Sequence, residues 1–387
     1  MQLSDVSSTA GSIVTCKAAI CWESGAPPVI EQIQVAPPQK GEVRIRMLFS
    51  SACHTDCHSM AGLDEYTIFP TILGHEGAGI VESVGEGVKT LAPGDPVVPL
   101  YIAECGKCGP CLGNRTNMCV KSRAWLCKGV MADGTTRFSC RGKEIGYYMS
   151  ISAFSQYTVC PEEAVAKVDG ATEEDMRRLC LLGCGVPTGY GAVSRVAQIK
   201  PGSTVAVFGL GCIGLSCIQA AKHAGASRIL AIDLNPNRAP LAQAMGSTEF
   251  INPRDHAEKP IQQVIQEATG GGVDYAFECA GGNISVMRGA FESTHPTQGS
   301  CILISLAPSG HELSLNPMDL LTGRSVQGCI FGGIKGRTDI PRLADDYFNG
   351  KLKLDEYVNL EVPLDNINKA LMTMSTGKCI RPVIDMR

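Results

Sequence analysis

The segment that most constrains the fold is a glycine-rich turn between a short apolar strand and a helical stretch. The predicted strand, residues 203–208, reads STVAVF, and the turn GLGCIG contains Gly209, Gly211 and Gly214. The first glycine of such a turn permits a tight reversal, the second lets a pyrophosphate approach the backbone, and the third lets the helix pack closely on the strand. The segment therefore predicts a parallel α/β sheet that binds a dinucleotide.

An acidic residue follows where such a sheet needs one. Asp233 ends the next predicted strand, RILAID, about twenty residues beyond the last glycine, where a carboxylate accepts hydrogen bonds from the adenosine ribose. Its charge repels a ribose phosphate, which favours NAD over NADP. The alternative is a glycine turn and carboxylate that serve only the structure.

The order of predicted elements indicates two domains, which suits a chain of 387 residues. Strands and helices alternate from about residue 185 to 328, the pattern of βαβ units. Residues from about 15 to 99 read as short β-rich runs divided by glycine and proline, as in an antiparallel, barrel-like region. Mixed elements return after residue 328. The fold class is α/β, with a discontinuous first domain (1–185 and 329–387) and a nucleotide-binding domain (186–328).

Composition and charge indicate which binding partners are disfavoured and which cellular compartment to expect. The net charge of −4 and the lack of a basic run argue against a nucleic-acid partner. The uncharged stretch 201–221 is divided by glycines, so no membrane contact is expected. Nineteen cysteines, an odd number, suit metal ligation in a reducing compartment better than disulfides. Residues 1–12 resemble neither a signal peptide nor a transit peptide, and we expect a cytoplasmic protein.

Four of the cysteines have the spacing of a zinc site. The run ECGKCGPCLGNRTNMC carries Cys105, Cys108, Cys111 and Cys119 on a loop rich in glycine and proline. Four thiolates close a tetrahedral coordination shell, so the zinc they hold is structural. The alternative is chance clustering in a cysteine-rich chain.

Three further residues are candidates for a zinc site with an open position. Cys53 lies in ACHTDCH, His75 in LGHEGAG and Cys184 in LLGCGVPTGYGA. A catalytic zinc takes three protein ligands and leaves the fourth position for the reacting oxygen. Spacing alone does not join residues so distant in sequence, and a buried cysteine is more often a small apolar residue.

Together, in this order, these elements resemble the zinc-dependent medium-chain alcohol dehydrogenases from about residue 15 to the C-terminus. The resemblance implies a GroES-like catalytic domain interrupted by a Rossmann coenzyme domain, NAD as coenzyme and two zinc ions per chain. It assigns the catalytic zinc to Cys53, His75 and Cys184, and it implies a homo-oligomer, with a dimer expected and a tetramer as the alternative.

The resemblance also assigns the proton path. Thr55 accepts the proton of the substrate alcohol, and His58 passes it to solvent after it has crossed the coenzyme ribose. Asp56 orients His75 through its other ring nitrogen, and Glu76 lies behind the metal. The alternatives are a plain exposed histidine at 58 and satisfied buried carboxylates at 56 and 76.

The remaining coenzyme contacts implied by the resemblance are spread along the chain. His54 and Arg381 match basic positions that face the pyrophosphate, and Arg238 matches a cation beside the adenosine ribose; each could instead be a solvated charge. The full set beyond the glycines and Asp233 is His54, Thr188, Arg238, Ser305, Phe331 and Arg381.

Within the family the chain is most similar to the class III type, the S-(hydroxymethyl)glutathione dehydrogenases. The similarity rests on CHTD, MADGTTRF, TGYGA, VDYAFEC, TGRS and FGG. It implies Asp64, Tyr101 and Arg123 as substrate residues, with Arg123 able to pair with a carboxylate.

Several positions depart from that type. His58 stands where a tyrosine is usual, Pro187 replaces a small hydroxyl residue, and LISLAPSG, with Ser305 and Pro308, replaces a glycine- and valine-rich strand beside the nicotinamide. LNPMDL is altered as well. These changes bear on coenzyme pose, substrate or reaction.

The sequence therefore predicts NAD-linked interconversion of a primary or hydroxymethyl alcohol and its aldehyde. One alternative keeps the scaffold but cleaves a cyanohydrin to a carbonyl and cyanide, as plant hydroxynitrile lyases similar to this family do. Another is a non-catalytic nucleotide-binding sensor, in which an open metal site would have no role.

Overall fold

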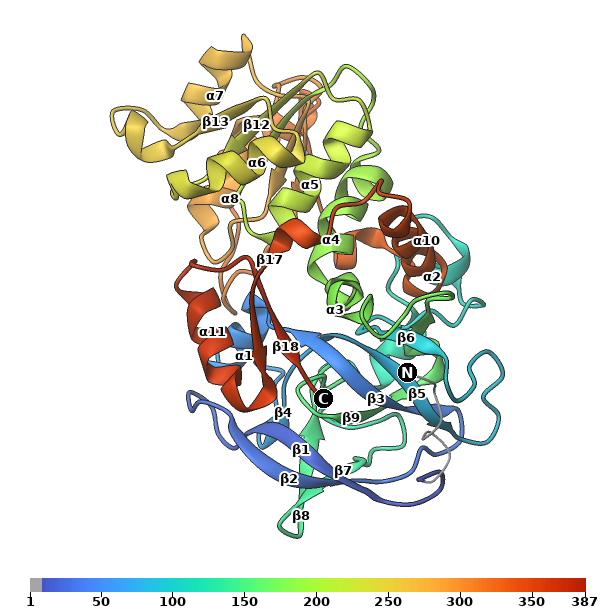
Figure 1. The fold of residues 1–387 in the computed structure, drawn as a ribbon. Coiled ribbons are helices and arrows are strands. Elements are labelled where there is room, and N and C mark those ends of the chain that lie inside the picture. Colours follow the sequence, from blue (N-terminus) through green and yellow to red (C-terminus); the bar gives the residue numbers. More distant parts are fainter. Residues whose placement is uncertain (1–8) are drawn as a thin grey trace. The chain divides into compact units, whose positions relative to one another are not determined.

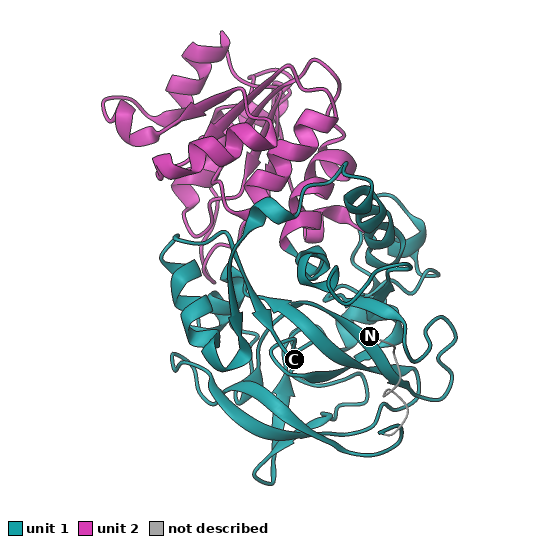
Figure 2. Cartoon of the chain, in the orientation of Figure 1, with its two compact units in different colours: residues 1–184, 335–387 teal, residues 185–334 magenta. Residues whose placement is uncertain are grey.

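The computed structural model describes residues 9–387, and the chain divides into two compact units (Figure 1, Figure 2). Unit 1 comprises the chain up to Cys184 together with Lys335–Arg387, and unit 2 comprises Gly185–Ile334. The predicted division falls after residues 185 and 328, near these boundaries. Of the opening segment 1–12, residues 1–8 lie outside the described residues.

Unit 1 is built on two sheets whose strands are mainly antiparallel. The closed barrel has the order β1-β2-β7-β8-β4, with bounds Val14–Cys21, Val29–Val35, Phe138–Cys140, Lys143–Tyr147 and Thr71–Ile72. The second sheet has the order β10-β6-β5-β3-β18-β17, with bounds Val165–Lys167, Pro96–Pro99, Glu76–Val84, Glu42–Ser51, Arg381–Asp385 and Val358–Pro363. A further strand, β9 (Tyr157–Pro161), pairs with β3.

The C-terminal residues complete the second sheet. β18 pairs antiparallel with the end of β3, where Val383 lies opposite Ser51, and β17 pairs parallel with β18. Nearly every residue of β3 is buried, as expected for a strand covered on both faces. Residues on both sides of unit 2 in the sequence therefore build one sheet.

Short helices fill the connections of unit 1. The α-helices are α1 (His54–Met60), α2 (Gly109–Leu112), α3 (Met176–Leu179), α10 (Gly336–Phe348) and α11 (Ile367–Ser375). The 3₁₀ turns are η1 (Val120–Ala124), η2 (Glu162–Ala164), η3 (Cys180–Gly183), η8 (Asp355–Tyr357) and η9 (Leu364–Asn366).

Unit 2 contains a parallel six-stranded sheet in the order β13-β12-β11-β14-β15-β16. The strands, in chain order, are β11 (Thr204–Phe208), β12 (Arg228–Ile232), β13 (Glu249–Ile251), β14 (Tyr275–Glu278), β15 (Ser300–Leu303) and β16 (Ser325–Gly328). The strand order reverses at β11, whose neighbours are β12 and β14. Such a reversal opens a crevice at the carboxyl ends of the strands, where nucleotides bind.

Helices connect the strands of this sheet. The α-helices are α4 (Gly185–Gly191), α5 (Cys212–His223), α6 (Ala239–Met245), α7 (Ile261–Thr269), α8 (Ile284–Glu292) and α9 (Pro317–Leu321). A π-helical segment, η4 (Ala192–Ala197), follows α4, and the 3₁₀ turns are η5 (Pro236–Arg238), η6 (Pro253–His256) and η7 (Phe331–Gly333). α5 packs on β11 and β12, while α8 packs on β14 and β15.

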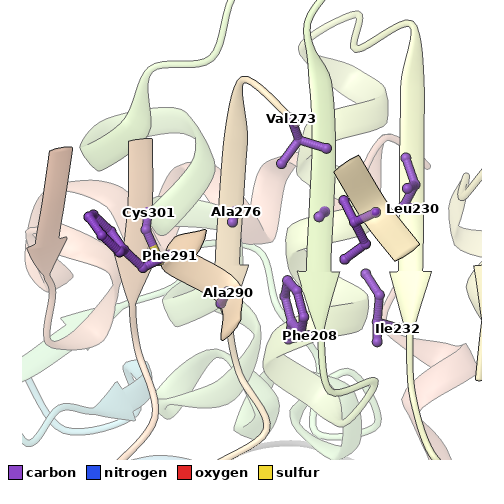
Figure 3. Packing of buried hydrophobic residues seen from close by; sticks show 10 residues of the cluster. Phe208, Leu230, Ile232, Val273, Ala276, Ala290, Phe291 and Cys301 are labelled. Atoms are coloured by element: carbon purple, nitrogen blue, oxygen red, sulfur yellow. The ribbon is translucent and has the colours of Figure 1, made fainter. Parts of the chain in front are cut away.

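The core of unit 2 lies along the central strands (Figure 3). Phe208, Ile232 and Phe291 are almost fully buried in it, and each such side chain contributes roughly 1.5–3 kcal/mol by its removal from water. The α/β class predicted from the alternating pattern is confirmed.

The uncharged stretch 201–221 is shared between a turn, β11 and the first part of α5. Within residues 9–387, no helix has the length and apolar character needed to cross a membrane.

Candidate metal centres and nucleotide site

Three distant parts of unit 1 bring Cys53, His75 and Cys184 together. Cys53 lies between β3 and α1, His75 immediately precedes β5, and Cys184 directly follows η3. Their ligand atoms and one carboxylate oxygen of Glu76 all lie within 4.8 Å of one another, and all four residues are buried. The structure thus answers the question that spacing left open, because these three candidates converge.

The two nitrogens of the His75 ring differ in their hydrogen bonding. Its Nδ1 lies 2.9 Å from Asp56 Oδ1, and the same carboxylate accepts hydrogen bonds from the backbone N–H groups of Gly74 (3.1 Å) and Cys53 (2.8 Å). Nε2 is buried and has no hydrogen-bond partner in the described part of the chain. A buried ring nitrogen without a partner, beside two thiols, fits a metal ligand whose ion completes its bonding.

A buried arginine lies behind this set. Arg381 donates to both oxygens of Glu76 (3.1 Å each) and to Cys53 Sγ (3.3 Å). The hydrogen bond with Cys184, aided by the charges of Arg381 and His75, holds the pKa of the Cys53 thiol well below its usual range despite burial. This lowering of the pKa favours the thiolate form of Cys53, the form that binds zinc. A pyrophosphate contact of Arg381 stays a prediction.

Two tyrosines flank His75. The rings of Tyr101 and Tyr148 each meet the imidazole edge-on at 5.9 Å between centroids, and the Tyr101 hydroxyl lies 4.0 Å from Cys184 Sγ. Tyr148 forms a 2.8 Å hydrogen bond with the Ser59 hydroxyl. Tyr101 was predicted as a substrate residue, but Tyr148 and Ser59 were missed, because no local motif marks a contact between residues so distant in sequence.

Helix α1 carries the proposed proton path. The Thr55 hydroxyl lies 3.7 Å from Cys53 Sγ, so it borders the metal ligands. His58 is half-buried one helical turn further on, on the same side of α1. His54, at the start of α1, is exposed.

The two charged substrate candidates lie in different local settings. Asp64 accepts hydrogen bonds from the backbone of Tyr66 and Thr67 (2.9 and 2.7 Å), which closes its own loop. Burial opposes ionisation of Asp64, but these bonds and one from Ser59 lower its pKa below the ordinary value. Arg123 is exposed on η1. Of the three substrate candidates, only Tyr101 is shown in contact with the metal ligands.

The second cysteine group forms a compact cluster. The Sγ atoms of Cys105, Cys108, Cys111 and Cys119 lie within 4.8 Å of one another. These cysteines pack in a small hydrophobic cluster that also contains Trp125. Lys335 donates to the backbone carbonyls of Cys111 (2.6 Å) and Gly113 (2.7 Å). Four thiols around one centre leave no open ligand position, which fits a structural zinc.

The glycine turn of unit 2 has the geometry of a nucleotide cradle. Gly209 has φ +85°, and a Cβ at Gly214 would lie 1.9 Å from the Gly209 carbonyl oxygen. A Cβ at Gly211, by contrast, would meet nothing within 4 Å. The first and third glycines are therefore needed by the turn itself, whereas the second leaves space at the start of α5 for a phosphate.

The other coenzyme candidates surround the carboxyl edge of this sheet. Asp233 follows β12, and its carboxylate accepts hydrogen bonds from the backbone of Leu210 and Asn235 (2.7 Å each). Ser305 follows β15 and donates its hydroxyl hydrogen to Glu278. Arg238 ends η5.

Thr188 and Phe331, both buried, lie on contacting elements, α4 and η7. A Cβ at Gly332 would lie 2.4 Å from the Thr188 carbonyl oxygen. This close approach brings two coenzyme candidates from the opposite ends of unit 2 together.

Comparison with known proteins agrees with both units. Residues 39–170 match the alcohol dehydrogenase GroES-like domain and residues 212–348 match the zinc-binding dehydrogenase family. Alcohol dehydrogenase class-3 of Pisum sativum is 51% identical over 377 residues, covering 97% of this chain and 99% of the relative. The class-3 enzyme of Dictyostelium discoideum is 50% identical, covering 98% and 100%.

Solved structures show the same fold. An alcohol dehydrogenase zinc-binding domain protein from Burkholderia ambifaria has a TM-score of 0.90 at 34% identity, covering 97% of this chain and 100% of that one. Benzyl alcohol dehydrogenase from Acinetobacter calcoaceticus has a TM-score of 0.88 at 29% identity, with the same coverage.

None of these relatives is named a lyase or a sensor, so the comparisons lend no support to those two alternatives. The resemblance predicted from sequence, including its class III character, and the GroES-like and Rossmann-type fold are confirmed. With its paired zinc-type ligand clusters and class-3 relatives over nearly its whole length, the chain belongs to the zinc-dependent alcohol dehydrogenase family and is an enzyme of that family.

Proposed function

We propose that the chain is a zinc- and NAD-dependent dehydrogenase that interconverts a primary or hydroxymethyl alcohol and its aldehyde. The observation that carries the proposal is the Nε2 of His75, which has no hydrogen-bond partner among residues 9–387 and lies close to the thiols of Cys53 and Cys184. Three ligands leave one tetrahedral position free, as catalytic zinc sites require. The names of the class-3 relatives support this reaction class.

A zinc ion held by Cys53, His75 and Cys184 would supply Lewis-acid chemistry to the alcohol oxygen, and bound NAD would supply the hydride acceptor. Asp56 fixes the ring orientation of His75 through Nδ1, which leaves Nε2 as the nitrogen that would bind the ion. Arg381 balances the charge of Glu76 and donates to Cys53, which stabilises its thiolate.

The side chains of α1 handle the proton. Thr55, beside Cys53, takes the proton of the substrate hydroxyl, and His58 releases it to solvent. Histidine suits this step because its unperturbed pKa lies near neutrality.

Unit 2 binds NAD at the carboxyl edge of its sheet. The open space at Gly211 and the start of α5 would accept the pyrophosphate, and the Asp233 carboxylate would accept hydrogen bonds from the ribose. We assign further coenzyme contacts to His54, Thr188, Arg238, Phe331 and Arg381, and substrate contacts to Asp64, Tyr101 and Arg123.

The four-cysteine cluster holds a second, structural zinc, which gives two ions per chain. Its loop has few apolar residues of its own, so the metal supplies stabilisation that packing does not.

A homodimer formed through unit 2 is the proposed assembly. Edge strand β16 has exposed residues along its length, and nearby on the chain Met318 and Leu321 of α9 are 57% and 77% exposed. An open strand edge with apolar neighbours favours pairing with a second copy.

We place the protein in the cytoplasm, because all nineteen cysteines are free thiols.

The test combines metal content with product formation. Zinc-loaded protein is incubated with NAD and an alcohol panel that includes hydroxymethylglutathione, NADH is followed, and cyanohydrin cleavage is assayed in parallel. We expect NADH from a primary or hydroxymethyl alcohol, and loss of that activity in C184S with one zinc lost per chain.

Cys180, fully buried four residues before Cys184 but outside the ligand set, provides the matched control. C180A should keep both ions and the activity. Cyanide release without NADH, or NADH binding without turnover of any alcohol, would contradict the proposed reaction.

A further inference from the structure

A buried carboxylate lies at the carboxyl edge of the parallel sheet of unit 2. Glu278 is the last residue of β14 and is 0% exposed. One of its oxygens accepts hydrogen bonds from the backbone N–H groups of Ala280 (2.8 Å) and Gly281 (3.2 Å), and the other accepts the hydroxyl of Ser305. A carboxylate in such a place is stable only while its oxygens are hydrogen-bonded.

The turn held by Glu278 packs against the glycine cradle. A Cβ at Gly209 would lie 2.6 Å from Ala280 Cα, and the Cys279 N–H donates to the Phe208 carbonyl at 2.8 Å. No side chain separates the two turns, so a displacement of residues 279–281 moves the first glycine of the cradle.

The segment that follows β14 is also hydrogen-bonded to the loop that follows β15. Ser305 belongs to this loop, the Ile304 N–H donates to the Glu278 carbonyl (3.1 Å), and the Gly282 N–H donates to the Leu306 carbonyl (2.9 Å). The Ser305 side chain thus provides the one side-chain bond in this set of links between the two loops. Both loops lie at the edge of the sheet across which dinucleotides bind.

We infer that Ser305 is a positioning residue for the coenzyme: through Glu278 it holds residues 279–281 against Gly209 and thereby sets the shape of the dinucleotide cradle. The inference rests on the proposed function, since it concerns the binding of NAD. Ser305 acts through its protein partner, because its hydroxyl hydrogen is committed to Glu278.

Removal of the hydroxyl leaves one Glu278 oxygen short of a donor and loosens both loops. We expect S305A to weaken NADH binding about tenfold, the change that corresponds to one hydrogen bond to a charged group. The KM for NAD should rise in parallel, while zinc content stays at the wild-type value. S305T keeps a hydroxyl and should restore the affinity.

The matched control is Ser227→Ala. The Ser227 hydroxyl also donates a hydrogen bond, to the Gly202 carbonyl at 2.6 Å, but Ser227 precedes β12 at the amino edge of the same sheet. NADH affinity is measured by fluorescence titration of the full-length, zinc-loaded protein. S227A should bind NADH like the wild type.

A drop in thermal stability of S305A with unchanged NADH affinity and KM would overturn the inference, because Ser305 would then serve stability alone. An equal loss of affinity in S227A would overturn it as well. If wild type binds no NADH, the proposed function fails together with the inference, whereas binding by wild type and equally by S305A rejects the inference alone.

Hydrogen exchange of the wild type provides a readout that needs no variant. Addition of NADH should slow exchange at residues 279–282 and 304–306 together with Gly209. Protection of Gly209 without protection of the two loops contradicts the inference even if S305A does not fold.

Discussion

Replacing Asp56 with asparagine tests whether this carboxylate sets the strength of the catalytic metal site. Asp56 is fully buried and makes three contacts, to the His75 ring and to two backbone N–H groups. An asparagine of the same shape can direct its oxygen to His75 and Gly74, and its amide nitrogen then faces the N–H of Cys53. D56N thus removes one acceptor and the negative charge beside the ring.

The magnitude follows from these contacts. A buried donor left without its partner costs about 1–3 kcal/mol, which corresponds to roughly 5- to 150-fold in a binding constant. Loss of the group that orients a metal-bound histidine weakens metal affinity by about 10- to 100-fold. We therefore expect the site formed by Cys53, His75 and Cys184 to bind zinc about 10- to 100-fold more weakly in D56N, and metal binding by the four-cysteine cluster to be unchanged.

The assay is competition with a graded series of chelators, followed by measurement of zinc per chain and of NADH formation. E82Q is the matched control, because Glu82 is also a buried carboxylate of unit 1 but pairs with Arg44. E82Q should lower stability and keep both ions. If D56N binds zinc at this site as tightly as the wild type, Asp56 does not set metal affinity through His75.

Three further predictions concern other parts of the chain. K335M removes the ammonium group that donates to two backbone carbonyls of the four-cysteine loop. Each hydrogen bond from a charged group contributes about 1.5–3 kcal/mol, so chelators should extract the proposed structural zinc faster from K335M than from the wild type. An extraction rate equal to that of the wild type would contradict this prediction. G214A places a methyl group 1.9 Å from the Gly209 carbonyl, and NADH fluorescence titration should show lost binding with intact zinc content. Burial opposes ionisation of Glu82, but the hydrogen bonds and charge of Arg44 lower its pKa below the ordinary value. The ion pair therefore stabilises the fold above the unfolded-state pKa of Glu82, and this stabilisation is lost as pH falls through the folded-state pKa. Acid unfolding of E82Q should lack this pH-dependent loss of stability.

Local chemistry explains what the sequence could predict. The turn after β11 and the four-cysteine loop are each encoded within fewer than twenty residues, because their glycines or thiols must lie close together along the chain. The family resemblance extended this to Cys53, His75 and Cys184, which spacing could not join. The structure shows their convergence through the folding of β3, β5 and η3.

The missed contacts are those made by tertiary packing. Ser59 meets Tyr148 across 89 residues, and Lys335 reaches the carbonyl of Cys111 across 224. Ser305 was predicted to lie beside the coenzyme, but its bond to Glu278 could not be predicted, because neither residue belongs to a motif that names the other. Hydrophobic periodicity specifies which face is buried and leaves open which polar groups meet there.

The placement of Arg381 on β18 has a consequence for biosynthesis. Cys53 and Glu76 precede unit 2 in the sequence, whereas their buried partner Arg381 follows it, and the end of β3 gains its β18 neighbour from the same later segment. Unit 2 is continuous in sequence and can fold on the ribosome as a unit, whereas unit 1 must wait for contacts of very large sequence separation. The surroundings of Cys53 and Glu76 are therefore completed only when the residues that follow unit 2 have been made, so a nascent chain that stops at the end of unit 2 could carry a folded unit 2 but would lack Arg381 beside these two side chains.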